Sequence, residues 1–149
     1  MSADILKWRY PENTFDIVVS QEVLEHFDEQ DAYLAVAHGL LKKGGHLILT
    51  TPNRRTFEAV PEHTPVVDAL QPIENWLYAH ELKSLLRQRF SNVRVTTVVP
   101  GRGVKGSYRV ASSYRLRRAL DRIGMRGAFE TVALRAGFGL NLLAIARKD

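Results

Sequence analysis

The residues best suited to chemistry stand together, directly after an apolar run. In FDIVVSQEVLEHF, residues 15 to 27, a β-branched segment is followed by Glu22, Glu25 and His26. At spacings of three and four residues, these side chains can face the same way on one helical turn. Two carboxylates and an imidazole can hold a divalent cation with open positions for an oxygen substrate. Such an ion would lower the pKa of an acceptor hydroxyl and orient it.

Two further roles stay open for this cluster. Glu25 and His26 can line a substrate pocket, with His26 as the candidate base. The cluster can also be purely structural, supporting the turn that carries it. Trp76 and Tyr78 have the same two interpretations, as part of an acceptor pocket or of the core.

A strand, a helix and a second strand are expected to position the cluster. Residues 15–20 predict a strand buried on both faces, because the β-branched run lacks polar alternation. Residues 28–43 predict an amphipathic helix, with Asp28 as N-cap and Gly44-Gly45 as its stop. Residues 46–51 predict the next strand. This order gives a βαβ unit with a right-handed crossover.

The remainder is expected to complete one α/β domain over residues 1–149. Residues 53–76 lack a clear period and predict a long loop or lid with one short helix. A basic insertion, 101–139, separates the last two predicted strands. The other predicted elements are a helix over 77–90, a strand over 92–100, a helix around 110–123 and a strand over 140–148.

The composition is that of an ordinary globular domain. The 149 residues are 45% hydrophobic and 25% charged. The absence of cysteine excludes disulfides and cysteine-based metal or redox chemistry. No apolar run approaches the roughly 20 residues of a membrane span, and the first residues lack a signal-peptide core. We therefore expect a cytoplasmic protein.

The positive charge is concentrated in one segment. Residues 101–127 hold eight basic side chains and one acid, so they carry +7 and the rest of the chain −2. Such a segment is usually a solvated helix face; an anionic substrate, RNA or a membrane surface are the alternatives. GRGVKG, residues 101–106, matches the glycine pattern of phosphate-binding loops. Since a lone match is weak, we interpret it as a flexible basic turn.

Four stretches in order resemble class I S-adenosylmethionine-dependent methyltransferases of the type 11/12 group. They are Ala3-Asp4, FDIVVSQEVLEH, LLKKGGHLILTTPN and HELKSLLRQRFSNVRV, and together they cover about residues 3–100. The resemblance implies a Rossmann-like α/β fold with a mostly parallel sheet flanked by helices. It also implies methyl transfer from S-adenosyl-L-methionine to a small-molecule acceptor.

The resemblance carries over to a set of cofactor residues. Asp4 and Ile5 would bracket the adenine, and Ser20, Gln21 and Glu22 would contact the cofactor at the carboxyl end of their strand.

The resemblance does not favour a metal ion. In ubiquinone-pathway and small-RNA methyltransferases the positions like Glu22, Glu25 and His26 serve a metal. In the RNA enzymes a further histidine corresponds to Asn75, a poorer ligand. Nucleic acid is therefore an alternative acceptor that the sequence does not favour.

The resemblance also implies a partial domain. The stretches match strands four to seven of the family, whereas the glycine-rich cofactor loop and the ribose-binding acid belong to strands one to three. Strand 15–20 would then be an apolar edge, and such an edge tends to pair. We expect a homodimer through this edge or a partner supplying the missing half. A chain inactive by itself, or a methyltransferase remnant that acts as a binding module, is the alternative to an enzyme.

Overall fold

A four-stranded mixed sheet forms the centre of the protein. The structure, a computed structural model, describes residues 5–6, 11–59, 73–101, 103, 105–111 and 113–149. In the order β1-β2-β4-β3, β1 and β2 are parallel, and β4 is antiparallel to both of its neighbours. Three strands thus run the same way, and the expected α/β fold is confirmed. The strands are β1 Phe15–Gln21, β2 Leu41–Pro52, β3 Ser91–Pro100 and β4 Gly139–Arg147.

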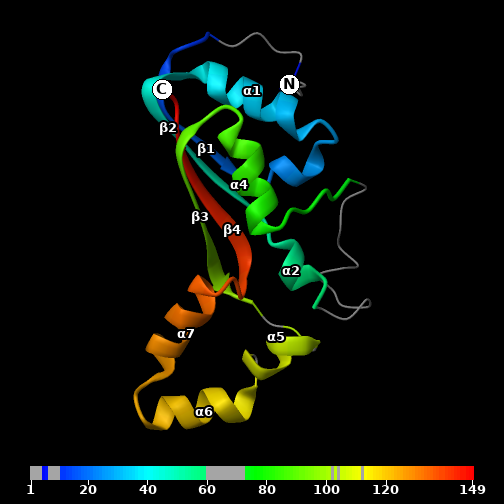
Figure 1. Ribbon diagram of the computed structural model, residues 1–149, viewed down its shortest axis with the longest axis vertical. Helices are drawn as coiled ribbons and strands as arrows, with labels where there is room; N and C mark the ends of the chain where they lie inside the picture. The colour runs from blue at the N-terminus through cyan, green and yellow to red at the C-terminus, as the bar shows by residue number, and fades with distance from the viewer. Residues whose placement is uncertain (1–4, 7–10, 60–72, 102, 104, 112) are drawn as a thin grey trace.

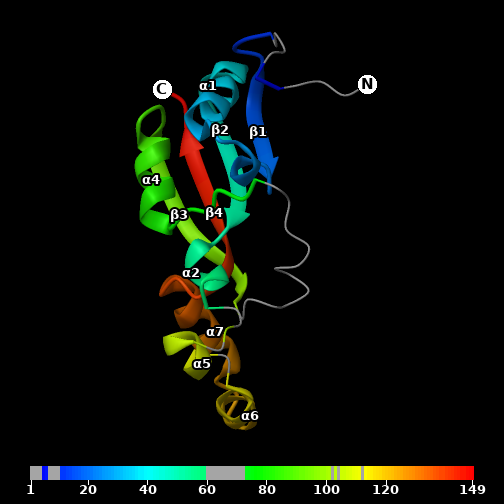
Figure 2. The ribbon, with the colours of Figure 1, turned by 90° about the vertical axis from the view of Figure 1, so that its right-hand side faces the viewer.

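Two helices cover one face of this sheet. They are α1, Gln30–Leu40, and α4, Ala79–Arg87, and they lie on the same side of the strands (Figure 2). The apolar side chains of both helices pack on those of β2, β3 and β4. The core contains Leu24, Tyr33, Leu34, Ala37, Leu41, Leu47, Leu49, Leu82, Leu86, Phe90, Val93, Leu142, Ala144 and Ala146.

The boundaries of the βαβ unit differ from the prediction. Asp28 is not the N-cap of α1, because the helix begins at Gln30 and Glu29 occupies the cap without a side-chain hydrogen bond. The glycine pair does not end the helix either, since β2 already begins at Leu41. Gly44, at φ +83°, donates its backbone N–H to the Lys148 carbonyl at 2.8 Å. The pair therefore belongs to the irregular start of a strand.

The prediction that β1 is buried on both faces is wrong. Phe15, Ile17 and Val19 are 44%, 55% and 68% exposed. They lie on the face opposite α1 and α4, where Val19 neighbours Ile48 of β2 and Ile48 neighbours Ile145 of β4. Within the described residues this face of the sheet, called the open face below, has no helix packed on it.

The basic segment forms a helical arm at one end of the molecule (Figure 1). We call residues 106–135 the arm. A single helix was predicted around 110–123, but Ser113 interrupts it and caps the next helix by accepting from the Leu116 N–H at 3.4 Å. A third helix in the segment was not predicted. The arm helices are α5 Gly106–Ala111, α6 Tyr114–Arg122 and α7 Arg126–Arg135.

The glycines before the arm are packing positions. Gly101 is buried and donates its N–H to the Phe138 carbonyl at 2.8 Å; a Cβ there would lie 2.7 Å from the same oxygen. A Cβ on Gly103 would lie 2.8 Å from the Ala59 Cβ. Close backbone approach therefore explains these two glycines, and a loose turn does not. None of the helices in the described ranges has the length and apolar character needed to cross a bilayer.

Candidate functional site at the carboxyl ends of β1 and β2

The first feature of the site is the edge where two parallel strands end. Ser20 and Gln21 of β1 pair with Leu49 and Thr50 of β2. The Glu22 N–H donates to the Thr50 carbonyl at 3.0 Å and extends the ladder by one residue. In open α/β sheets this edge is where ligands bind. The sequence placed Ser20, Gln21 and Glu22 here, and the structure does the same.

Glu22 has an unusual backbone and an unsatisfied carboxylate. Its φ of +50° lies in the left-handed region, which costs a residue with a side chain roughly 1–2 kcal/mol. Its Oε1 is buried without a hydrogen-bond partner among the described residues, and so is the Thr50 Oγ1 on the next strand. Buried polar atoms nearly always have a partner, so two of them at one sheet edge indicate a polar ligand or water.

Glu25 is a buried carboxyl behind this edge. Its side chain is 2% exposed, and Oε2 accepts from the Thr51 hydroxyl at 2.9 Å. Burial raises the pKa of Glu25, and the negative charge of Glu22 acts in the same direction. A carboxyl so enclosed can position the residues around it.

His26 lies beside Glu25 and keeps one ring nitrogen available. Nδ1 is 3.0 Å from the Ile73 carbonyl, which can only accept, so Nδ1 carries the proton in this contact. In the neutral imidazole Nε2 is then the accepting nitrogen, and it lies 3.9 Å from Glu25 Oε1. The side chain is 27% exposed. A partly exposed imidazole held in this tautomer has the chemistry of a general base.

Asn75, near the end of the segment 53–76, contacts the turn that carries Glu25 and His26. Its side chain donates to the Phe27 carbonyl and to Asp28 Oδ1, both at 3.1 Å. Its backbone N–H donates to the Glu25 carbonyl at 2.8 Å. The residue aligned with a metal ligand therefore ties residues 73–75 to the 3-10 turn Leu24–His26. Among the described residues, no three His, Asp or Glu side chains are grouped as a metal site would require.

Ser20 and Gln21 point to different surroundings. Ser20 is 3% exposed and accepts from the Tyr33 hydroxyl at 2.7 Å, whereas Gln21 is exposed. Burial raises the pKa of Tyr33. Ile5 packs against the core, and Asp4 lies outside the described residues.

The two aromatic candidates pack near the short helix α2, Arg54–Phe57. The Trp76 ring lies 4.4 Å from that of Phe57, centroid to centroid, and its Nε1–H donates to Glu74 Oε2 at 2.8 Å. The Tyr78 hydroxyl donates to Glu58 Oε2 at 2.6 Å. The short helix expected within residues 53–76 is α2, and residues 60–72 of that loop lie outside the described part of the chain.

Three residues that sequence reasoning missed, Asn53, Thr56 and Tyr108, connect this edge to β4 and to the base of the arm. Asn53 is 2% exposed, and its Nδ2 donates to the Gly139 carbonyl at 2.8 Å. The Thr56 hydroxyl donates to the same carbonyl at 2.7 Å and lies 2.7 Å from the Tyr108 hydroxyl. Because 83 and 52 residues separate Thr56 from these partners, no local pattern could have revealed the contacts.

A polar site at the carboxyl ends of parallel strands is where open α/β folds bind ligands, and solved S-adenosylmethionine-dependent methyltransferases share the fold of this chain. The profile of the family described as "Methyltransferase domain" matches residues 2–97. The chain belongs to this methyltransferase family.

Known proteins agree with this assignment. The chain is 33% identical over 86 residues, 58% of its length, to a probable S-adenosylmethionine-dependent methyltransferase of Mycobacterium tuberculosis. Its fold matches a SAM-dependent methyltransferase from Thermotoga maritima, described as a possible histamine N-methyltransferase, with a TM-score of 0.63 and 17% identity. It also matches phosphoethanolamine N-methyltransferase 2 of Haemonchus contortus in complex with S-adenosyl-L-methionine, with a TM-score of 0.56 and 13% identity.

The chain is shorter than these proteins. It spans 30% of the length of the Mycobacterium relative. It covers 63% of the Thermotoga chain and 36% of the Haemonchus chain, although 100% and 98% of its own residues are matched. These two solved structures therefore contain further chain outside the part that this fold reproduces.

Proposed function

We propose that this chain contributes cofactor-binding and acceptor-binding residues to a methyltransferase site and that methyl transfer to a small-molecule acceptor takes place at the β1–β2 edge. The observation that carries the proposal is the pair of buried, unpartnered oxygens of Glu22 and Thr50 at that edge. The strained backbone of Glu22 supports it, because strain of this kind gathers at ligand sites.

Each residue of the site has a role in this proposal. When bound, S-adenosyl-L-methionine supplies a methyl group activated by a sulfonium. The Glu22 carboxylate fits the ammonium group at the amino acid end of this cofactor, and Asp4 is proposed to accept from its adenine amino group. His26 Nε2 takes the proton that an acceptor hydroxyl or amine loses as the new bond forms. Glu25 and Asn75 hold the turn that carries His26. The remaining catalytic contribution is alignment of donor and acceptor.

Isothermal titration of the 149-residue chain with S-adenosylhomocysteine tests the cofactor part. We expect micromolar binding that Asp4→Ala and Glu22→Gln each weaken about tenfold to a hundredfold, since a hydrogen bond to a charged group contributes roughly 1.5–3 kcal/mol. Glu12→Gln makes the same chemical change at an exposed position and should bind like the wild type. His26→Ala removes the base but no cofactor contact and should also keep its affinity.

Loss of binding only in Asp4→Ala and Glu22→Gln supports the proposal. A folded wild-type chain that binds no S-adenosylhomocysteine contradicts it for this chain alone and favours the non-enzymatic alternative, a binding module with methyltransferase ancestry.

We also propose that the edge of β1 and the open face pair with the complementary half of a methyltransferase domain. The exposed Ile17, Val19 and Ile145 form the apolar part of this surface. The solved relatives contain the additional chain that such pairing requires. Light scattering after size-exclusion chromatography separates the outcomes. A homodimer would identify a second copy as the occupant, and a stable, soluble monomer would contradict pairing by this chain alone.

A further inference from the structure

We propose that the arm docks the protein on an anionic lipid bilayer, lying in the interface without spanning it. This inference goes beyond the proposed methyl transfer and does not depend on it. It is carried by three properties of the arm: its charge, its exposed apolar side chains and its place in the fold.

The arm holds the net charge of the chain. Residues 106–135 contain seven arginines and two acids, a net +5, which equals the net charge of all 149 residues. The rest of the protein is therefore neutral overall. An anionic surface attracts this one end of the molecule and turns it toward the surface.

The arm also exposes apolar side chains between its arginines. Five large hydrophobic residues on it are more than half exposed, and no residue of α6 or α7 is buried. Large exposed apolar side chains that gather on one part of a protein indicate an interaction site. The five residues are Val110 at 64%, Tyr114 at 72%, Ile123 at 65%, Met125 at 53% and Val132 at 65% exposure.

Helix α6 has the pattern of an interfacial helix. Leu116, Leu120 and the C-cap residue Ile123 recur at helical spacing and form one stripe. The arginines occupy the other side, at positions 115, 118 and 122. Interfacial helices combine such a narrow apolar stripe with a strongly basic face and low overall hydrophobicity.

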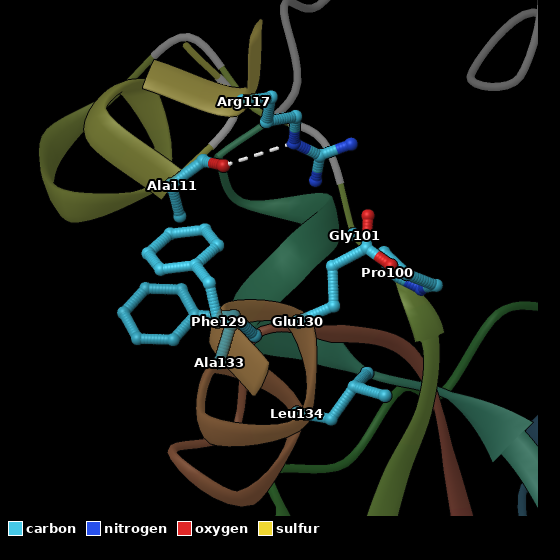
Figure 3. Close-up of a pocket in the computed structure, with 9 residues that line it drawn as sticks. Pro100, Gly101, Ala111, Arg117, Phe129, Glu130, Ala133 and Leu134 are labelled. Carbon is cyan, nitrogen blue, oxygen red and sulfur yellow. Dashed lines mark hydrogen bonds between the residues drawn. The ribbon is translucent and has the colours of Figure 1, made fainter. Parts of the chain in front are cut away.

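The inner side of the arm is already occupied by its own packing. Phe129, Ala133 and Leu134 of α7 line a small pocket against the end of β3 (Figure 3). Arg117 reaches across it, with Nε donating to the Ala111 carbonyl at 3.2 Å. The exposed apolar residues are thus additional to those that hold the arm to the sheet.

The base of the arm packs against the body of the protein at one end of the sheet. The buried Tyr108 at its base packs edge-on against Phe138, with ring centroids 4.9 Å apart, and lies within hydrogen-bonding distance of Thr56. Because β3 runs in the same direction as β1 and β2, the arm leaves the sheet at the edge that carries Glu22. Docking through the arm turns that end of the sheet toward the bilayer.

Two other possible partners of the arm, RNA and a second copy of the arm, fit these observations less well. RNA would use stacking on aromatic rings as well as charge, but Tyr114 is the single aromatic residue among the five exposed hydrophobics, and the other four are aliphatic. A second copy of the arm would bring two clusters of arginine together. A bilayer of anionic lipid accommodates both the charge and the aliphatic side chains.

Co-sedimentation with large unilamellar vesicles tests the proposal. We expect the full chain to bind vesicles of phosphatidylcholine with 30–40% phosphatidylglycerol (roughly the content that gives a strong surface potential) and not vesicles of phosphatidylcholine alone. Arg115→Glu/Arg118→Glu/Arg122→Glu should lower partitioning about a hundredfold or more, because each arginine near such a surface contributes about a factor of five. Ile123→Ser/Met125→Ser should lower it by a smaller factor at unchanged charge.

A matched control makes the same charge change on the body of the protein. Lys43, Arg87 and Arg94 are exposed and lie outside the arm, and their triple change to Glu should leave most vesicle binding intact. Circular dichroism confirms that each variant is folded.

Three results would overturn the proposal: an equal loss of vesicle binding in this control, equal binding to neutral vesicles, or unchanged binding by the Ile123→Ser/Met125→Ser variant. The proposal would also be overturned if a single-stranded RNA probe bound the chain and displaced it from vesicles when RNA and lipid are present at equal concentration. Vesicle binding without S-adenosylhomocysteine binding would leave this inference standing while the proposed function fails.

Discussion

At the scale of single residues, Glu25 is a carboxyl that is buried and can still ionise. Its carboxyl accepts from Thr51 in a 2% exposed position, and burial raises its pKa above the ordinary 4.5. A raised carboxyl pKa means that the folded state binds the proton more tightly than the unfolded state. The stability that protonated Glu25 contributes is therefore complete below about pH 4.5 and is lost as the pH rises through the folded-state pKa.

Glu25→Gln separates this ionisation from the hydrogen bond. The amide oxygen still accepts from Thr51, so the variant should be at least as stable as the wild type at pH 7, and the difference should disappear near pH 4. Urea unfolding at the two pH values measures this. Glu25→Ala leaves the Thr51 hydroxyl unpaired and should lose about 1–3 kcal/mol at both. A Glu25→Gln variant less stable than the wild type at pH 7 would show that the charge is stabilising.

At the scale of the elements, one glycine sets how closely β4 approaches β3. A Cβ on Gly139 would lie 2.6 Å from the Thr97 Cβ and 2.7 Å from the Val98 carbonyl oxygen. The Gly139 N–H also donates to Thr97 Oγ1 at 3.1 Å, and its carbonyl accepts from Asn53 and Thr56. The first residue of β4 thus joins the sheet, α2 and the base of the arm.

Gly139→Ala should lower the free energy of unfolding by about 1–3 kcal/mol, because the overpacked Cβ meets backbone that cannot move away. The matched control is Gly39→Ala in α1, where a Cβ meets nothing within 4 Å. Alanine is the better helix former, so this variant should gain roughly 0.5–1 kcal/mol. Thermal unfolding of both variants beside the wild type distinguishes them. Equal effects would mean that the approach of β4 to β3 is not tight.

At the scale of the whole molecule, the open face and the arm are two surfaces of different character. The open face exposes Ile17, Val19 and Ile145 and lies beside a strand edge that is unpaired within the described residues, a combination that promotes association. The arm mixes aliphatic side chains with arginines, which repel another arm. Contacts between copies should therefore form through the sheet.

Ile17→Thr/Val19→Thr should reduce self-association or the binding of a hydrophobic dye. Threonine keeps the strand preference of a β-branched residue while it removes apolar area. Val110→Thr/Val132→Thr makes a comparable change at arm positions that are 64% and 65% exposed and should leave association unchanged. Light scattering over a concentration series gives the measurement. A stronger effect from the arm variant would assign the contact to the arm.

Much of the fold and part of the site could be predicted from the sequence. All four strands and the two helices on the sheet fall where periodicity places them, with boundaries shifted by a few residues. The order of the motifs led to the methyltransferase family, which the profile match confirms. The position of Glu22 at the end of β1 was predictable, because one strand pattern and the residues after it are a local feature.

The tertiary structure alone decided what surrounds these residues. Glu25 meets Thr51 26 positions away, and the His26 tautomer depends on a carbonyl 47 positions away. Val19 is exposed because the helices cover the other face of the sheet. The apolar run of β1 would look the same in the sequence whether one face or both faces were covered. Local sequence determines which elements form, because their hydrogen bonds and spacings lie within a few residues. Burial, pairing and the choice of open surface depend on segments brought together from far along the chain.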